Sequence, residues 1–415
     1  MKKNTYIKGF LYLNVLFILL LLVNAIPRSS IEKNLVKTVN YYDDKENRYY
    51  VVNELPQSNH DVVTDCIVFN IISNIEPNNV LETTLNSRYY VTSDKYSNDL
   101  RATVLDNKSP NSNYSRYWHG YTMIYKLLLI FLSVKEIKVF MLLICAGLLA
   151  LLSILCYKNN LVKVILPLYV SFAICMILFS FNTLGHLFPL IISLIGSNII
   201  VSDKYQNESF LFFILGISVA FFDFLSIETL TLTLPLICLI AKYKEENKIL
   251  NMKNFISLNI HWLLGYIVTF LYKWLLCILV LGKEHLQTAT IKGLEEFKYS
   301  SSLTSGISLN INMLFPKCNS SNKTFVIYLL FLLLVGLFCF LFHKKDCNKY
   351  KTISCLTIIF FIPYIRFLVL NNHSVYHYFF TYRAQISSIL CLFLIIQYTL
   401  DLKMILKILK IKPNK

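Results

Sequence analysis

The stretch VFMLLICAGLLALLSILCY, residues 139–157, contains no charged side chain. It is long enough to cross a bilayer as one helix, because the hydrocarbon core is about 30 Å thick and a helix rises about 1.5 Å per residue. Together with nine further apolar runs, it predicts an all-α polytopic membrane protein with about ten transmembrane helices. The other runs lie at about residues 9–26, 162–181, 186–202, 208–225, 229–241, 255–282, 324–342, 352–370 and 384–401.

The composition of the whole chain points the same way. Of its 415 residues, 55% are hydrophobic and only 15% are charged, which leaves too little polar surface for soluble domains of this length. The net charge of +16 comes mainly from short lysine clusters between the apolar runs. Such clusters are typical of orientation signals in a membrane, whereas nucleic-acid binding needs a continuous basic face.

One more run, residues 117–133, contains His119 and Lys126 and is rich in aromatic residues, which favours a helix lying in the membrane interface. If this run stays outside, the lysines of 242–254, 343–351 and the tail 402–415 all face the cytoplasm. A crossing at this run would turn those lysines outward, against the positive-inside rule. We therefore expect both chain ends in the cytoplasm and a multi-pass protein of the cell membrane.

These features divide the chain into a helical bundle and an extracytoplasmic loop domain. Within the first outer loop, an apolar-periodic stretch at residues 62–72 predicts a short helix. The expected parts are a first transmembrane helix (1–26), an extracytoplasmic loop domain ending in the interfacial helix (27–138), a transmembrane bundle (139–282), a second extracytoplasmic loop, partly helical at its start (283–323), further transmembrane helices (324–401) and a basic cytoplasmic tail (402–415).

The chain has 11 cysteines, without a CxxC pair or a His/Cys spacing suited to zinc. Only Cys66 and Cys318 fall in the predicted outer loops. They could form one disulfide or remain two free thiols.

The first outer loop carries acidic side chains that could act as a general base or bind a divalent cation. Asp61 and Asp65 are four residues apart, so a helix would place both carboxylates on one face. Asp43 and Asp44 form an earlier acidic pair. The alternative is that these acids are solvated groups on a loop.

An aromatic sequence, YWHGY (117–121), follows Arg116 directly before the interfacial run. Trp118, His119 and Tyr121 at headgroup level could hold a lipid-linked substrate by stacking and hydrogen bonding. The guanidinium of Arg116 offers parallel donors to a phosphate. An ordinary aromatic belt at the membrane surface would need no ligand.

A third group precedes the last predicted span, in the sequence NNHSVYHYFFTYR (371–383). His373 and His377 are four residues apart and could bind a metal, but no third ligand stands nearby in the sequence. Phosphate binding by Arg383 together with these histidines fits the residue types better. A polar helix cap that reaches to water is the alternative.

Three ionisable residues fall inside predicted spans, where a charge is costly without a partner or a task. Asp223 and Arg366 lie near the outer ends of their spans, so they could pair across the bundle or line one cavity. Lys273 could reach to the membrane surface or face a cavity.

The order of these features resembles that of GT-C glycosyltransferases. Members of that family have a first span, a large outer loop with a catalytic acid, an amphipathic segment with aromatic and basic residues, and then the remaining helices. Here the span 9–26, the acids between 43 and 65 and the segment 116–132 occupy these places, although the Pro-Pro-Leu-Tyr common in that segment is absent. The motifs RYWHGY (116–121), FFDFL (221–225) and the segment 372–383 are also similar to multi-span membrane proteins of low-GC Gram-positive bacteria.

The resemblance implies transfer of a sugar from a polyprenyl-phosphate carrier to a surface glycan or lipid at the outer face. Asp65 or Asp61 would deprotonate the acceptor hydroxyl, and a divalent cation could assist the phosphate. The groups that would bind the phosphate are Arg116, His119, His373, His377 and Arg383.

Three alternatives remain open from the sequence. A glycan polymerase or ligase would depend more on the second outer loop, 283–323. A transporter or flippase of a lipid-linked substrate would use Asp223, Lys273 and Arg366. A non-catalytic membrane protein would use its outer loop only to bind partners.

Overall fold

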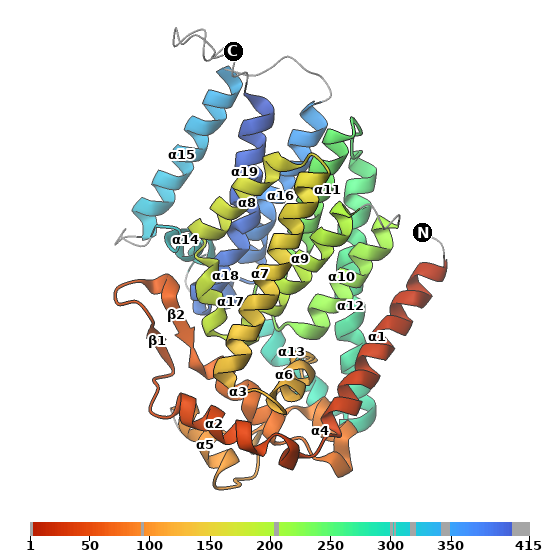
Figure 1. Cartoon of the computed structure of the whole chain (residues 1–415), viewed down its shortest axis with the longest axis vertical. Coiled ribbons are helices and arrows are strands. Elements are labelled where there is room, and N and C mark those ends of the chain that lie inside the picture. The colour runs from red at the N-terminus through yellow and green to blue at the C-terminus, as the bar shows by residue number, and fades with distance from the viewer. Residues whose placement is uncertain are drawn as a thin grey trace.

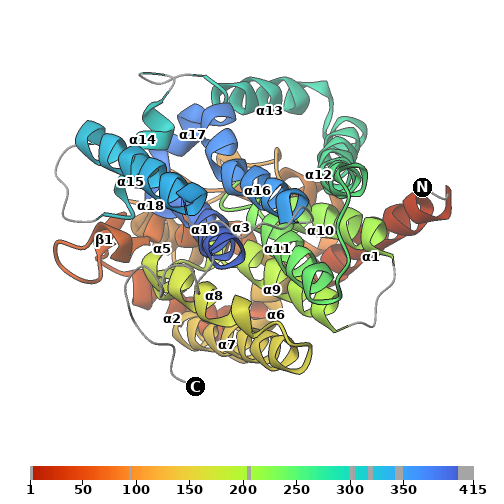
Figure 2. The ribbon, with the colours of Figure 1, turned by 90° about the horizontal axis from the view of Figure 1, so that it is seen from above.

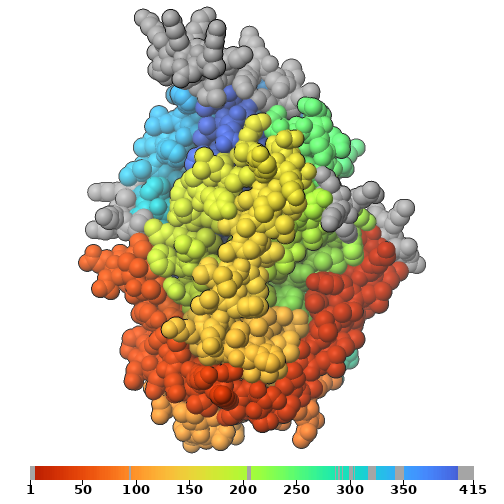
Figure 3. All heavy atoms as spheres, viewed as in Figure 1, coloured from red at the N-terminus to blue at the C-terminus, as the bar shows by residue number. Residues whose placement is uncertain are grey.

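Residues 3–92, 95–202, 207–298, 302, 304–315, 321–341 and 349–400 are described by the computed structural model of the chain. A bundle of helices forms most of the molecule, and a smaller domain covers one of its ends (Figure 1). In the space-filling view, the residues that follow the first helix cover that end on the face turned to the viewer (Figure 3). The tail 402–415 and Cys318 lie outside the described residues.

Seven helical segments of the described chain are long and apolar enough to cross a membrane. This is the architecture of a multi-pass α-helical membrane protein, so the predicted all-α class is confirmed. The segments are Thr5–Asn24, Val134–Lys158, Leu184–Val201, Met252–Leu281, Thr324–Leu341, Tyr350–Val369 and Tyr378–Thr399.

The other three predicted spans are shorter helices. A helix of 13 residues is only about 20 Å long, which is less than the thickness of the hydrocarbon core. The first of them ends early because Met176 adopts a left-handed backbone conformation, with φ of 46°. The predicted count of about ten spans is therefore not reached by helix length alone. The three helices are α8 (Val162–Ile174), α10 (Glu208–Phe222) and α11 (Leu230–Glu245).

The bundle is held together by close helix contacts. Where α10 meets α12, Gly216 and Gly265 let the two backbones touch, because a Cβ at either position would collide with a carbonyl oxygen of the other helix. The remaining bundle elements are α1 (Lys3–Asn24), α7 (Val134–Lys158), η4 (Ile177–Asn182), η5 (Leu184–His186), α9 (Phe188–Val201), α12 (Met252–Leu281), α15 (Ser321–Leu341), α16 (Lys349–Val369), α17 (Asn371–Tyr376), α18 (Tyr378–Thr381), η6 (Tyr382–Gln385) and α19 (Ile386–Thr399).

The cap over the bundle, which we call the loop domain, comprises residues 27–133. Its helix α3 confirms the short helix predicted at 62–72. Strands β1 and β2 pair antiparallel, with Arg48 opposite Asp61. The elements are η1 (Arg28–Ser30), α2 (Glu32–Tyr42), β1 (Arg48–Tyr50), η2 (Pro56–Ser58), β2 (Asn59–Asp61), α3 (Val62–Ser73), η3 (Pro77–Asn79), α4 (Val80–Asn86), β3 (Arg88–Tyr89), α5 (Tyr96–Val104), β4 (Ser112–Asn113) and α6 (Tyr121–Leu129).

The helix predicted to lie in the interface at 117–133 is shorter than expected. It begins only at Tyr121, because His119 has a left-handed backbone with φ of 52°. Lys126 is buried in the protein, where its Nζ donates to the carbonyl oxygen of Asn24 at 2.8 Å. This bond satisfies a backbone acceptor at the end of α1 that has no partner within the helix. Phe131, just beyond α6, is 79% exposed.

The segment predicted to form the second outer loop, residues 283–323, begins with a helix. Helix α13 (Lys283–Glu295) lies at the periphery of the bundle when the molecule is seen from above (Figure 2). A further helix, α14 (Ser305–Asn312), enters the core, where the Asn310 side chain donates to Ser374 and accepts from Thr381.

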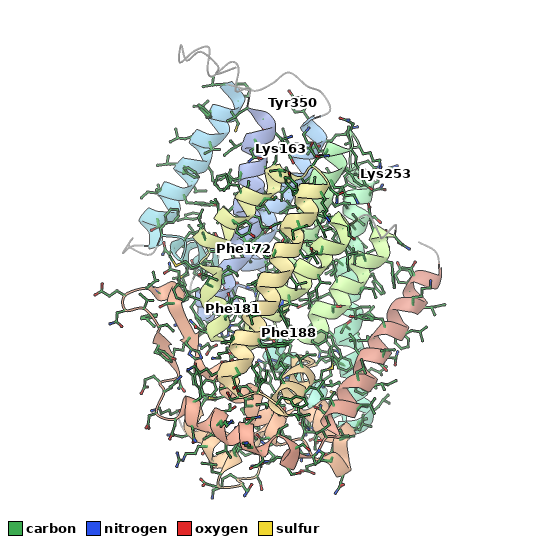
Figure 4. The ribbon with its side chains drawn as sticks, in the orientation of Figure 1. Lys163, Phe172, Phe181, Phe188, Lys253 and Tyr350 are labelled. Atoms are coloured by element: carbon green, nitrogen blue, oxygen red, sulfur yellow. The ribbon has the colours of Figure 1, made fainter. Side chains whose placement is uncertain are left out.

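The lysine-rich end of the bundle lies away from the loop domain. Lys163 and Lys253 stand there together with Tyr350, whereas Phe181 and Phe188 lie nearer the loop domain (Figure 4). The two lysines therefore occupy one end of the molecule, although helices α8 to α11 separate them in the chain.

A buried carboxylate ties the loop domain to the bundle. Asp65 Oδ2 accepts a hydrogen bond from the Tyr42 hydroxyl at 2.7 Å and lies 3.1 Å from Lys138 Nζ in α7. Its Oδ1 accepts from the backbone N–H of Leu184 at 2.7 Å. Lys138 also donates to the carbonyl oxygen of Asn182. Asp65 has no exposed surface, so this ion pair is removed from water.

Burial alone would raise the pKa of Asp65. The charge of Lys138 and hydrogen bonds from His60 and Tyr42 outweigh burial and hold that pKa well below its ordinary value. Asp65 is therefore ionised at neutral pH. Because its unfolded pKa is about 3.9, its stabilising contribution is complete above that pH and is lost as the pH falls below it.

We expect Asp65→Asn to destabilise the protein by about 3–5 kcal/mol, because Lys138 would be left buried without its counter-charge. The measurement is thermal unfolding of purified protein in detergent at pH 7. Asp43→Asn is the matched control, since Asp43 pairs with Arg101 at 2.9 Å on the surface. That exposed pair contributes about 0–1 kcal/mol. Equal effects of the two substitutions would contradict the anchoring role of Asp65.

Candidate functional site

Asp61 lies where the loop domain meets the bundle. It is the last residue of β2 and the N-cap of α3, and its carboxylate accepts from the Thr64 hydroxyl at 2.6 Å. Its Oδ2 lies 3.9 Å from His186 Nε2, and its Oδ1 lies 3.9 Å from Arg48 Nε. Only 3% of Asp61 is exposed. The residue therefore brings a buried carboxylate to the bundle.

A row of neighbouring rings connects His186 with the late segment of the chain, residues 371–383. The rings of His186 and Phe380 are 3.9 Å apart, those of His377 and Phe380 are 5.2 Å apart, and those of His373 and His377 are 4.6 Å apart. The rings of His186 and Phe380 thus connect the early acid with the late histidines. We call this set, with Asp61, the acid–histidine cluster.

Guanidinium groups surround the acid–histidine cluster. Arg383 is 4% exposed and donates from Nη2 to the carbonyl oxygen of Gln57 at 3.0 Å. Arg48 stacks on the ring of Phe379 at 4.3 Å. Arg366 Nη2 lies 3.2 Å from His373 Nδ1. The arrangement is rich in donors suited to an anion.

Several buried polar atoms here have no hydrogen-bond partner within the described part of the chain. They are His186 Nε2, His377 Nδ1, Arg383 Nε and, beside the cluster, Arg116 Nε. Buried donors and acceptors without partners are costly and rare, so a group of them marks a place where a ligand could complete the bonding.

The two acids predicted to share one helix face have different environments. Asp61 precedes the helix as its N-cap and faces His186, whereas Asp65 in the first turn faces Lys138. Asp61 therefore lies outside the helix, and the two carboxylates do not share one helix face as expected. Burial raises the pKa of Asp61, and the Thr64 hydrogen bond and Arg48 only partly oppose that rise. Of the two carboxylates, Asp61 is the stronger base, and it would give up fewer interactions when it takes a proton.

His377 is held in its neutral form. Burial, followed by the charge of Arg48 and of Arg366, lowers the pKa of His377 to about 3. A neutral imidazole can both donate and accept a hydrogen bond, so His377 can contact a phosphate oxygen or a hydroxyl without carrying a charge.

Of the two alternatives for Asp223 and Arg366, pairing across the bundle is not what the structure shows, because Arg366 pairs with another acid. Arg366 Nε binds Glu228 Oε1 at 3.0 Å in a buried ion pair. Asp223 ends α10 and accepts from the N–H of Ser226 at 2.9 Å and from its hydroxyl at 2.5 Å. Leu225, with φ of 73°, reverses the chain between the two acids. That turn brings Glu228 into contact with Arg366, while the carboxylate of Asp223 bonds to Ser226 within the turn.

Lys273 does not reach the surface of the protein. Its Nζ donates to the carbonyl oxygen of Leu85 in α4 at 2.7 Å, and it lies 5.5 Å from the ring of Trp118. Lys273 is fully buried. It joins α12 to the loop domain, much as Lys126 joins α6 to α1.

The YWHGY sequence (117–121) docks the loop domain onto the bundle. Trp118 Nε1 donates to the carbonyl oxygen of Thr269 at 2.8 Å. His119 bonds through one ring nitrogen to the Tyr121 hydroxyl at 2.5 Å and through the other to the Tyr114 carbonyl oxygen at 2.8 Å. Both nitrogens of His119 are thus already occupied.

Arg116, before that sequence, lies beside Glu296, the residue that follows α13. Its Nη2 is 3.9 Å from Glu296 Oε1, and its guanidinium stacks on the rings of Tyr114 and Tyr117 at 4.5 and 5.1 Å. Its Nε is among the buried atoms without a partner, so Arg116 remains available to an anion.

The remaining candidates lie elsewhere. Asp43 pairs with Arg101 at the surface, and Asp44 is exposed in the turn after α2. Cys66 is buried within α3 with a free thiol. Across the described ranges, no group of three His, Cys, Asp or Glu side chains could hold a metal ion.

Sequence reasoning missed several residues of this region. His186 stood at the edge of a predicted span, and Arg48 and Glu296 stood in loops without a motif. Lys138 and Glu228 could have been identified from the sequence, because a charged residue at the end of an apolar run needs a buried partner. The identity of each partner depends on the tertiary structure.

Comparison of the chain with protein-family models, with curated proteins and with solved structures gives no match to any of them.

We expect Asp61→Asn to leave the melting temperature at pH 7 unchanged or higher. The pKa of Asp61 is raised on folding, so its ionised form is less favourable in the folded than in the unfolded state, and stability falls as the pH rises through that window. Asn removes the charge and remains a good N-cap. Differential scanning fluorimetry in detergent measures the effect. A melting temperature as low as that of Asp65→Asn would show that Asp61 is a structural anchor instead.

Proposed function

We propose that the protein resides in the cell membrane and transfers a sugar from a polyprenyl phosphate to a surface glycan or lipid at the outer face. The observation that carries this proposal is the position of Asp61. A buried carboxylate with a raised pKa stands beside His186, and Arg383 with unused hydrogen-bonding capacity lies in the same region. The resemblance of the chain layout to GT-C glycosyltransferases supports the same reaction class.

In the proposed reaction, Asp61 takes the proton of the acceptor hydroxyl. The hydroxyl oxygen then forms a bond to the anomeric carbon of the donor sugar, and the bond from that carbon to the phosphate oxygen breaks. The electron pair leaves with the polyprenyl phosphate, and the configuration at the sugar inverts. Arg383 and Arg48, with neutral His377, stabilise the charge on the leaving phosphate.

Asp65 has a different task in this proposal. Its oxygens already accept from Tyr42 and from the backbone of Leu184 and contact Lys138. The low pKa that results makes it a weak base. It holds α3, and therefore Asp61, against the bundle.

We also propose that α8, α10 and α11 cross the membrane, which makes ten spans. The support is the position of Lys163 and Lys253 at one end of the bundle (Figure 4). If only the seven long helices crossed, one crossing (α9) would separate the two lysines and place them on opposite sides. With ten spans both lysines are cytoplasmic, as the positive-inside rule requires.

Cysteine labelling tests this topology. Lys253→Cys and Lys108→Cys replace exposed residues, the first at the lysine-rich end and the second in the loop domain. On intact cells, we expect a membrane-impermeant maleimide to label position 108 at once and position 253 only after permeabilisation. Labelling of position 253 on intact cells would favour seven spans.

Variants of the cluster test the chemistry. We expect Asp61→Asn and Arg383→Ala to lower incorporation of labelled sugar into the surface glycan by about 100-fold or more, at a normal protein level. Loss of a base and loss of a phosphate contact each act on the transition state. Asp43→Asn, far from the cluster, should retain full incorporation.

Binding of undecaprenyl phosphate distinguishes the role of Asp61 as the base from the role of Arg383 as a phosphate ligand. We expect this lipid to raise the melting temperature of the wild type and of Asp61→Asn, but not that of Arg383→Ala. Unchanged sugar incorporation in both cluster variants would exclude the proposed reaction. Lipid-linked sugar that no longer reaches the outer face would indicate a transporter.

A further inference from the structure

A hairpin of the loop domain exposes consecutive apolar side chains. The segment Tyr50-Val51-Val52 comprises the last residue of strand β1 and the two residues after it, and these residues are 46%, 50% and 45% exposed. A run of exposed apolar side chains on a rigid turn marks a surface that contacts something other than water.

The turn is held in shape by its own hydrogen bonds. The N–H of Val51 donates to the Ser58 carbonyl oxygen at 3.2 Å, and the N–H of Val52 donates to the Ser58 hydroxyl at 3.0 Å. The Ser58 hydroxyl in turn lies 2.7 Å from the carbonyl oxygen of Leu55. The apolar side chains are therefore presented by an ordered turn.

The base of the hairpin rests on the outer ends of membrane-spanning helices. Gln57 Nε2 donates to the carbonyl oxygen of Met313, the residue that follows α14. Arg48 stacks on Phe379 and Tyr50 lies near Tyr378, both at the start of the span Tyr378–Thr399. The base of the hairpin thus lies at the level at which the span Tyr378–Thr399 begins.

The views of the ribbon agree with this placement. The hairpin projects from the side of the molecule on which α15 lies, just beyond the end of that helix nearest the loop domain (Figures 1 and 2). The bend of the hairpin points away from the bundle in both views (Figures 1 and 2).

We propose that the hairpin tip, Tyr50-Val51-Val52, docks into the lipid surface at the outer face of the membrane. A tyrosine beside two valines suits this boundary, because the rings of Tyr are stable at headgroup level and the valines favour the acyl region. The tip continues into strand β1, where Arg48 lies opposite Asp61. The docked hairpin would therefore fix the height of Asp61 above the lipid, whether or not the protein transfers a sugar.

Site-directed spin labelling tests the docking. Val51→Cys carries the nitroxide, and Lys108→Cys, exposed in the same domain, is the matched control. Both are made in a background with Cys318→Ser and Cys347→Ser, since the other nine cysteines are buried. In nanodiscs, we expect the label at position 51 to be several-fold more accessible to oxygen than to a water-soluble nickel chelate, with the reverse at position 108.

Two outcomes would overturn the proposal. A label at position 51 that the nickel chelate reaches as readily as position 108 would place the tip in water. A label that neither reagent reaches would mean that protein, such as a second copy of the chain, covers the tip. Transfer of the protein from nanodiscs to detergent should leave the accessibility at position 108 unchanged, which checks that the domain stays folded.

Discussion

The carboxylate of Asp65, which has no contact with water, holds the loop domain and the bundle together. A buried charge is tolerated only if its partners compensate the loss of hydration. Here the partners come from three separate parts of the chain: Tyr42 in the loop domain, Lys138 in α7 and the backbone of Leu184. Because each part must remain in place to satisfy the charge, the carboxylate sets their relative positions.

This anchor also builds the candidate site. The segment that bonds to Asp65 and Lys138, residues 182–184, continues directly into His186. On the other side, α3 carries Asp65 in its first turn and Asp61 at its N-cap. The contact between Asp61 and His186 is therefore a consequence of the anchor four residues away. Asp65 accepts bonds from several donors and has a structural role. Asp61 has few bonds, so its carboxylate is available for chemistry.

The late segment of the chain is held by a second buried pair. Arg366 binds Glu228 and also donates to Ser374 at 3.0 Å, so α16, α17 and the start of α11 are joined. This places His373 and His377 over Phe380 and brings Arg383 to Gln57 of the loop domain. Both ion pairs lie at the end of the bundle that the loop domain covers, which leaves the lysine-rich end free of the cluster.

The sequence by itself determined the class of this protein, because long apolar runs can be stable as helices in lipid wherever they pack. It also determined the short helix after Asp61 and the set of acids, histidines and arginines from which the site is built. Only the tertiary structure decided which of these residues meet. Spacing placed Asp61 and Asp65 on one helix face, but the helix begins after Asp61, so the two carboxylates point to different partners. In the same way, the turn at Leu225 places Glu228, and not Asp223, against Arg366. Pairing of buried charges depends on contacts between distant segments, which the local pattern of residues does not contain.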